Sequence, residues 1–259
     1  MTPRILPLNQ LQNGKCGNCP RNQMCFGRFL SDQNLADQLD FEIANRILHR
    51  GDHVFYSGQE FTSLYMVRSG HVKTVMVTED GEEQITGFPG PGDSIGADGL
   101  ASGHYAVDAI ALDTVSICTL NFDHMLRNSA SREEVPQLLL KMFSELVFNN
   151  EQMLLTLGKL DAQQRMASFL LKQSQAQMRN GCSPVSFTLA MSRADIGNHL
   201  NLAVETVSRL LTQFKQRGLI KFNRNDIEWL DIDGLANLSN RREYTLPTGE
   251  ENVAAARLN

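Results

Sequence analysis

Residues 192–215 read SRADIGNHLNLAVETVSRLLTQFK, a pattern typical of two helices joined by a tight turn. Ser192 can cap the first helix, with Asp195 in the place that Glu or Gln usually takes in a capping box. A turn at 201–203 leads to a second helix that ends near Gly218. Apolar residues at helical spacing are expected to face inward. They are Ile196 and Leu200 in the first helix and Val204, Val207, Leu211 and Phe214 in the second.

The opposite face of the second helix is polar near the end that a recognition helix inserts into the major groove. Arginine can pair bidentately with guanine, glutamate can accept from cytosine, and serine can contact a base or a phosphate. An internal Glu/Arg salt bridge on a solvated face is the alternative. Because residues 219–230 look like a strand, a turn and a strand, the sequence favours a winged helix-turn-helix. The expected contacts to double-stranded DNA are Glu205, Ser208, Arg209 and Thr212.

A long helix is predicted from Pro136, a favourable first-turn residue, to about Leu160. Its apolar residues recur at spacings of three and four and form a broad stripe. A core helix within one chain is one interpretation. The polar Asn150 in the stripe favours a parallel homodimer instead, because such a residue fixes the register of two helices. The expected interface is Leu139, Phe143, Leu146, Val147, Asn150, Leu154 and Leu157.

The preceding region, residues 28–122, contains short β-branched and aromatic segments with turn signals about every ten residues. Asp80-Gly81 is a strong hairpin turn before the segment 84–88. A jelly roll is therefore predicted. The expected fold class is α+β, with an N-terminal β-roll, a long dimerisation helix and a C-terminal winged helix-turn-helix.

The chain of 259 residues fits two modest domains with connecting pieces. No apolar run approaches the roughly 20 residues that span a membrane, and residues 1–15 lack a secretion signal. A soluble, cytoplasmic protein is expected. The predicted parts are a cysteine-rich segment at 1–27, the β-roll at 28–130, the dimerisation helix at 131–160, the helix-turn-helix domain at 161–239 and a mobile tail at 240–259.

The net charge of −5 argues superficially against a nucleic-acid partner, because phosphates are bound mainly by Lys and Arg. The charge is unevenly distributed, however. Residues 161–230 hold nine Lys/Arg and five Asp/Glu, so this part carries +4 and the rest of the chain −9. The asymmetry favours a DNA-facing part carried by an acidic one. An enzyme is not expected, since the sequence has neither a glycine-rich nucleotide loop nor a paired acid/base motif.

Three cysteines, Cys16, Cys19 and Cys25, fall within ten residues. Cys118, in a predicted strand, and Cys182, in a predicted loop, are candidates for a fourth thiol. Four thiolates in a reducing compartment suit zinc or an iron-sulfur cluster. A triplet with a distant partner fits a cluster better, because structural zinc usually takes two tight pairs. Zinc and unmetallated thiols remain the alternatives.

These features together resemble the CRP/FNR family of transcription regulators, in particular the regulators of fumarate and nitrate reduction, over most of residues 15–235. The likeness rests on the cysteines, the hairpin at 80–88 and the segments 195–198 and 204–209. It implies a 4Fe-4S cluster held by Cys16, Cys19, Cys25 and Cys118. It also implies that Glu205, Ser208 and Arg209 read a palindromic TTGAT-N4-ATCAA-type site. The implied function is oxygen-responsive control of anaerobic metabolism, as activator or repressor, with the cluster promoting dimerisation and oxygen destroying it.

Relatives that sense a cyclic nucleotide carry an arginine in the phosphate-binding turn of the β-roll. Residues 92–107 contain none, and Asp93 and Asp98 would repel a phosphate, so a cyclic nucleotide is rejected as the effector. A regulator of the same fold with zinc or no metal, responding to another signal such as nitric oxide or haem, is the alternative. The resemblance also implies an RNA polymerase contact at the hairpin, for which a solvated turn is the alternative. The hairpin residues are Asp80, Gly81, Glu82 and Glu83.

The sequence departs from the family pattern at two positions. Ala203 stands where relatives often have a threonine that can cap the recognition helix, and a weaker helix start is expected. Pro20 directly follows Cys19, where relatives often place a small polar residue.

Overall fold

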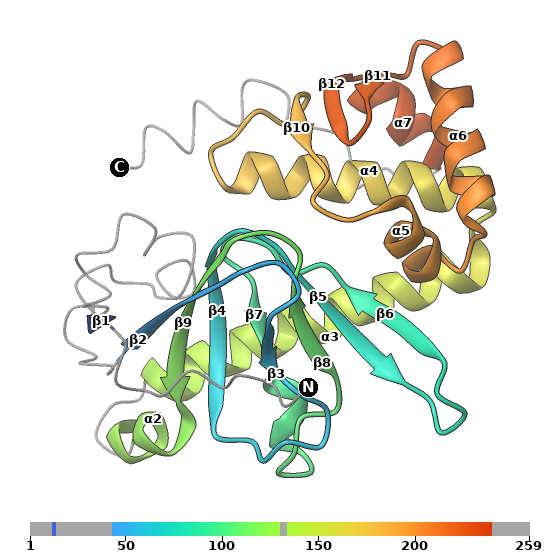
Figure 1. Ribbon diagram of the computed structural model, residues 1–259. Coiled ribbons are helices and arrows are strands. Elements are labelled where there is room, and N and C mark those ends of the chain that lie inside the picture. The colour runs from blue at the N-terminus through green and yellow to red at the C-terminus, as the bar shows by residue number, and fades with distance from the viewer. Residues whose placement is uncertain (1–11, 14–42, 130–133, 240–259) are drawn as a thin grey trace. The chain divides into compact units, whose positions relative to one another are not determined.

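The computed structural model describes residues 12–13, 43–129 and 134–239 (Figure 1). The chain divides into two compact units, residues 1–151 and 152–259. The boundary falls inside one long helix, so the last turns of that helix belong to the second unit.

The first unit is the predicted β-roll, built from two antiparallel sheets (Figure 1). One sheet has the strand order β1 (Gln12–Asn13), β2 (Ile43–Leu48), β9 (Val115–Asn121), β4 (Ser63–Ser69) and β7 (Ser94–Ile95). The other has the order β3 (His53–Phe55), β8 (Asp108–Ala111), β5 (Val72–Val77) and β6 (Glu83–Gly87).

An aromatic stack fills the core of the β-roll. The Phe55 ring lies 4.0 Å from the Tyr105 ring and 5.4 Å from the Tyr65 ring, measured between centroids. The Tyr105 hydroxyl donates to the carbonyl of Ser63 at 2.8 Å, and burial raises the pKa of the Tyr65 phenol. Val115 and Ile117 of β9 are fully buried in the same core, so the next residue, Cys118, belongs to the opposite face of its sheet.

Consecutive strands β4 and β5 belong to different sheets, and the connection between them needs a glycine. Gly70 has a φ of 78°, and a Cβ there would lie 2.5 Å from the carbonyl oxygen of Thr114. Any other residue at position 70 would therefore have a strained backbone conformation, and its Cβ would clash with the Thr114 carbonyl oxygen. β5 then pairs with β6 through the predicted Asp80-Gly81 hairpin, which is confirmed.

Two helices and a short 3-10 helix complete the first unit. The 3-10 helix η5 (Ala97–Leu100) and the helix α2 (Phe122–Ser129) were not expected from the sequence. The long helix α3 runs from Glu134 to Lys159, with Pro136 in its first turn as predicted. Its partly buried Leu139 packs against a small cluster of Leu64 and Met125.

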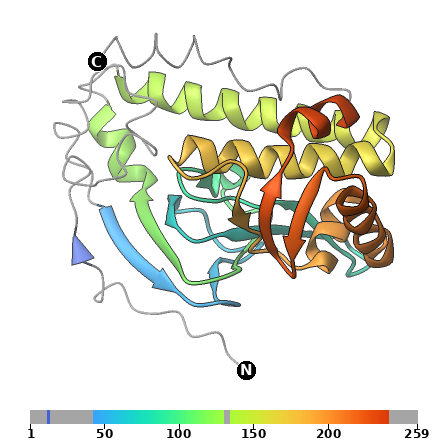
Figure 2. The same ribbon diagram turned by 90° about the horizontal axis from the view of Figure 1, so that it is seen from above.

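The second unit confirms the winged helix-turn-helix. Beyond the end of α3 it comprises α4 (Ala162–Arg179), β10 (Phe187–Thr188), α5 (Arg193–Leu200), α6 (Val204–Gln216), β11 (Ile220–Asn223), β12 (Asp226–Leu230) and α7 (Ile232–Ser239). The sheet order is β10-β12-β11, and α7 packs on α4 (Figure 2). α7 was missed as a separate helix, although its buried residues Ile232, Leu235 and Ala236 have helical spacing.

Candidate nucleic-acid interface and cysteine ligand

The helix α5 begins at the predicted cap. The Ser192 hydroxyl oxygen accepts from the Asp195 backbone N–H at 3.1 Å, and the Asp195 carboxylate accepts from the Ser192 backbone N–H at 3.0 Å. The capping box is therefore complete with aspartate in place of glutamate. α5 ends at Leu200 and is followed by Asn201, whose φ of 52° lies in the left-handed region that asparagine tolerates. The chain thus reverses within three residues before α6 begins.

Gly197 permits the close turn between α5 and α6. A Cβ at this position would lie 2.6 Å from the Leu202 carbonyl oxygen, nearer than non-bonded atoms approach. The N–H of Leu202 donates back to the Gly197 carbonyl at 2.8 Å. Any side chain at residue 197 would push the two helices apart, so glycine fixes the angle at which α6 is presented.

The inner face of α6 agrees with the sequence prediction at three of four positions. Val207, Leu211 and Phe214 are buried, as expected. Val204 was wrongly placed inward, since it is 39% exposed. It is the first residue of α6, where no preceding turn of the helix covers it. Leu210, which the prediction omitted, is buried between Val207 and Phe214 at spacings of three and four.

The outer face of α6 carries the four predicted DNA contacts. Glu205, Arg209 and Thr212 are exposed, and Ser208 is half-buried. In the part of the chain that the structure describes, Glu205 and Arg209 form no ion pair with each other. The structure therefore does not contain the internal salt bridge that was the alternative for this face. A carboxylate and a guanidinium are both presented for base contacts.

The two hydroxyls on this face have different hydrogen-bonding roles. The Ser208 Oγ accepts from Nη1 of Arg193 at 3.3 Å, which leaves the serine proton to be donated outward. The Thr212 hydroxyl donates to the Ser208 carbonyl at 3.0 Å, so its proton is used within the helix. Thr212 therefore offers DNA an acceptor oxygen and a methyl group.

Cations of α5 and α6 meet at the wing. The Lys215 Nζ lies 5.3 Å and the Arg193 Cζ 5.7 Å from the centroid of the Phe222 ring in β11, within cation–π range. The roles of Arg193 and Lys215 were not expected from the sequence, because only the fold brings them to Phe222. On the exposed wing, a hydrogen bond with Glu228 at 2.8 Å raises the pKa of Lys221. The neighbouring Trp229 on β12 is 46% exposed.

The helix α6 starts without a side-chain cap, as expected from the alanine at position 203. Ala203 has a φ of −62° and a ψ of 146°, the extended geometry of an N-cap. We expect Ala203→Ser to raise the free energy of unfolding by about 1 kcal/mol, because the hydroxyl can accept an otherwise unpaired N–H of the first turn. Urea unfolding of the two proteins measures the difference. An equal or lower stability of the serine variant would contradict the expectation.

Cys118 lies in β9 between Asn45 of β2 and Met66 of β4. Its thiol is half-buried, is not in a disulfide, and donates to the Asn45 Oδ1 at 3.2 Å. Cys182, the other candidate for the fourth ligand, is exposed in the loop after α4. The described residues contain no cluster of three metal-ligating side chains. The predicted partners of Cys118 lie outside the described residues; they are Cys16, Cys19 and Cys25.

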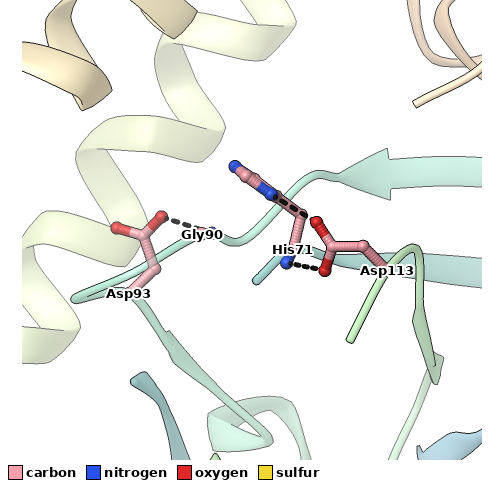
Figure 3. A network of polar contacts seen from close by, with 4 residues as sticks. All are labelled: His71, Gly90, Asp93 and Asp113. Atoms are coloured by element: carbon pink, nitrogen blue, oxygen red, sulfur yellow. Dashed lines mark hydrogen bonds and ion pairs between the residues drawn. The ribbon is translucent and has the colours of Figure 1, made fainter. Parts of the chain in front are cut away.

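Asp93 and Asp98, the two aspartates of residues 92–107, bind backbone N–H groups of their own chain. The Asp98 carboxylate accepts from Ala106 at 2.7 Å, and the Asp93 carboxylate accepts from Gly90 at 3.0 Å (Figure 3). Nearby, Asp113 accepts from both the backbone N–H and the ring of His71 (Figure 3). These two backbone donors are therefore already paired with carboxylates of the chain.

The hairpin between β5 and β6 projects beyond the two sheets (Figure 1). Its tip is stabilised by Thr78, whose hydroxyl oxygen accepts from the Glu82 N–H at 3.1 Å. The four residues predicted to contact another protein, Asp80, Gly81, Glu82 and Glu83, are all exposed.

The helix α3 exposes a row of large apolar side chains. Leu140, Val147 and Leu154 are 68%, 56% and 72% exposed and recur every seven residues. Phe148 and Leu155 extend the row at the same interval. Of the other predicted interface residues, Asn150 is exposed and Phe143, Leu146 and Leu157 are partly buried. A seven-residue apolar repeat is the pattern of a helix that pairs with another helix.

None of the described helices is long and apolar enough to cross a membrane.

Comparisons with known proteins agree with both units. Residues 45–130 match the cyclic nucleotide-binding domain family, and residues 164–238 match the Crp-like helix-turn-helix domain family. The chain is 36% identical over 244 residues to the fumarate and nitrate reduction regulatory protein of Escherichia coli strain K12, covering 92% of this chain and 97% of that protein. It is 37% identical to the transcriptional activator protein FnrA of Stutzerimonas stutzeri, covering 86% and 92%.

A solved structure shows the same architecture. The structure of FixK2 from Bradyrhizobium japonicum superposes with a TM-score of 0.69 and is 27% identical, covering 76% of this chain and 96% of that one. The matched relatives are regulatory proteins that include a transcriptional activator, which confirms the expectation that the chain is not an enzyme.

Proposed function

Because this chain belongs to the CRP/FNR family of DNA-binding transcription regulators, we propose that it is an oxygen-responsive regulator of anaerobic metabolism. One observation carries the proposal. The chain aligns over 92% of its length with a fumarate and nitrate reduction regulator, and the Cys118 thiol, which is not in a disulfide, lies on the sheet face away from the β-roll core.

The proposed cofactor is one 4Fe-4S cluster per chain, held by Cys16, Cys19, Cys25 and Cys118. The donor chemistry fits, because thiolates are the usual ligands of such clusters and Cys118 is neither fully buried nor oxidised. A bound cluster would supply sensitivity to oxygen. The four cysteines would tie residues 16–25 to β9, and loss of this tie would remove a brace from the β-roll and weaken the dimer. Cys118 is favoured over Cys182 because the family resemblance implies Cys118 as the fourth ligand.

The proposed dimer places a second copy of the chain against the exposed apolar row of α3. In the single chain, Leu140, Val147 and Leu154 expose large apolar surface to water at intervals of seven residues. Pairing with the same helix of a second copy would cover this surface and accounts for the repeat. A dimer presents two copies of α6 to two half-sites, which suits a palindrome of the TTGAT-N4-ATCAA type. The predicted interface residues Leu139 and Leu146 lie at the edges of this row, and Leu139 already contacts its own β-roll.

We expect Arg209→Ala to relax base preference at one position of the half-site by ~1–3 kcal/mol, because a bidentate pair with guanine is lost. Binding to duplexes with each substitution at that position measures the effect. Arg217→Ala serves as the control, since it removes the same charge from an exposed position just after the end of α6, outside the proposed contacts. Equal binding of the Arg209→Ala protein and the parent across all duplexes would overturn the assignment of Arg209.

Two further parts of the proposal concern other partners. The carboxylates of Asp93 and Asp98 already hold the backbone donors of the turn, which supports the rejection of a cyclic nucleotide. The β5–β6 hairpin is the proposed contact to RNA polymerase, because its acidic tip is exposed.

Anaerobic purification followed by iron analysis and an absorption spectrum tests the proposed function. A brown protein with about four irons per chain that bleaches in air is the expected result. Colourless protein with stoichiometric zinc, or with no metal, would overturn the cluster. It would favour instead a regulator of the same fold that responds to another signal, such as nitric oxide or haem.

A further inference from the structure

Arg165 in the first turn of α4 donates to three backbone carbonyls. Its Nη2 lies 2.8 Å from the carbonyl oxygen of Leu157, its Nε 2.9 Å from that of Leu160, and its Nη1 3.1 Å from that of Leu200. Leu157 belongs to the last turn of α3, Leu160 follows that helix, and Leu200 ends α5. One half-buried guanidinium therefore contacts the carboxyl ends of two helices.

These carbonyls are suitable partners for a cation. The last four carbonyls of a helix lack partners within the helix, and they carry its partial negative charge. A guanidinium is planar, and its N–H groups point in fixed directions, so three simultaneous acceptors cannot turn independently of one another. In the described part of the chain Arg165 has no carboxylate partner, so its charge is satisfied by these helix ends.

The junction that Arg165 bridges is short and has a glycine beside it. Only Leu160 and Asp161 separate α3 from α4. Gly158, in the final turn of α3, has open space where a Cβ would be, so no packing requires a glycine there. A glycine in a helix lowers its stability relative to alanine and allows it to bend. A contact that joins both sides of this junction, as Arg165 makes, restricts such a bend.

We propose that Arg165 is a positioning residue that locks α5 to the end of the dimerisation helix and thereby sets the spacing of half-sites that the dimer accepts. The inference rests on the proposed function for the dimer and the two-fold DNA site. Arg165 itself contacts no base. Arg165 acts on α6 through α5, because the close turn at Gly197 holds these two helices together. By fixing α5, it determines where the exposed face of α6 lies along the duplex.

Spacer discrimination tests the role directly. Anaerobically purified full-length protein is titrated with TTGAT-N4-ATCAA duplexes and with duplexes whose spacer is one base pair shorter or longer. The parent protein is expected to lose about a hundredfold in affinity on the altered spacers, since both half-sites can no longer be engaged together. Arg165→Lys can satisfy fewer of the three carbonyls and Arg165→Met none, so this penalty is expected to fall below about tenfold in both variants.

Lys172→Gln is the matched control, because it removes the same charge from an exposed position seven residues along α4. It is expected to keep the parental discrimination. Thermal unfolding and sedimentation are used to check that Arg165→Lys and Arg165→Met are folded and dimeric. If folded Arg165→Lys and Arg165→Met keep the full spacer penalty, Arg165 merely stabilises the unit and the inference is wrong. If the parent protein binds duplexes of all three spacer lengths with equal affinity, the proposed two-fold DNA site is wrong, and so is the proposed role of Arg165.

Discussion

Cys118→Ser protein purified without oxygen is expected to contain almost no iron, whereas the parent chain should retain about four irons. Serine keeps the size of the side chain and its hydrogen bond to Asn45, which the Cys118 thiol makes at 3.2 Å. β9 should therefore remain intact. What is lost is the soft thiolate donor, and a cluster with three cysteine ligands is bound far less tightly. Iron content and the visible spectrum, measured under argon, check this result.

Cys182→Ser is the matched control for this experiment. It removes the other thiol that the structure describes, in an exposed loop of the other unit. It is expected to keep the iron content and spectrum of the parent. The opposite outcome, iron retained in Cys118→Ser and lost in Cys182→Ser, would move the fourth ligand to the loop after α4.

Leu154→Glu is expected to convert the protein to a monomer and to weaken binding to the palindromic duplex by about 10²–10⁴-fold. A carboxylate at the centre of an apolar helix pair must be desolvated without a partner, which opposes association. The DNA contacts of each chain stay intact, so the loss is that of the second linked binding event. Because Leu154 is 72% exposed in the single chain, the substitution should not unfold it. Sedimentation velocity and DNA titration measure the two effects.

Asn149→Glu provides the control on the same helix. Residue 149 is exposed and lies five positions from residue 154, about 140° around the helix axis. It adds the same charge away from the apolar row and is expected to leave both dimer and affinity unchanged. A Leu154→Glu protein that still sediments as a dimer would show that the exposed row of α3 is not the interface.

The sequence predicted well those features that depend on neighbouring residues. The α5 cap, the turn at 201–203 and most of the inner face of α6 follow from spacings of three and four. Strand positions such as β5 and its hairpin were also predicted from local turn chemistry. Strand pairing was not, because nothing near Gly70 indicates that β4 and β5 separate into different sheets.

The site was predictable as a set of residue types but not as a set of contacts. Helical period alone identified Glu205, Ser208 and Arg209 as one face. The bond from Arg193 to Ser208 joins residues 15 positions apart, and that from Arg165 to Leu200 joins residues 35 apart. Such pairs are created by the packing of separate helices, so no local pattern contains them. The same reason explains why Val204 was misplaced, since its exposure depends on what lies beyond the start of its helix.

The exposed Trp229 on β12 gives this protein a built-in optical reporter. It is the chain's single tryptophan, so emission excited selectively at the indole band arises from one strand of the wing and nowhere else. A half-exposed indole is sensitive to the water around it. The approach of a duplex to the wing can therefore be followed on unlabelled protein, separately from events in the β-roll, whose aromatic stack contains only phenylalanine and tyrosine.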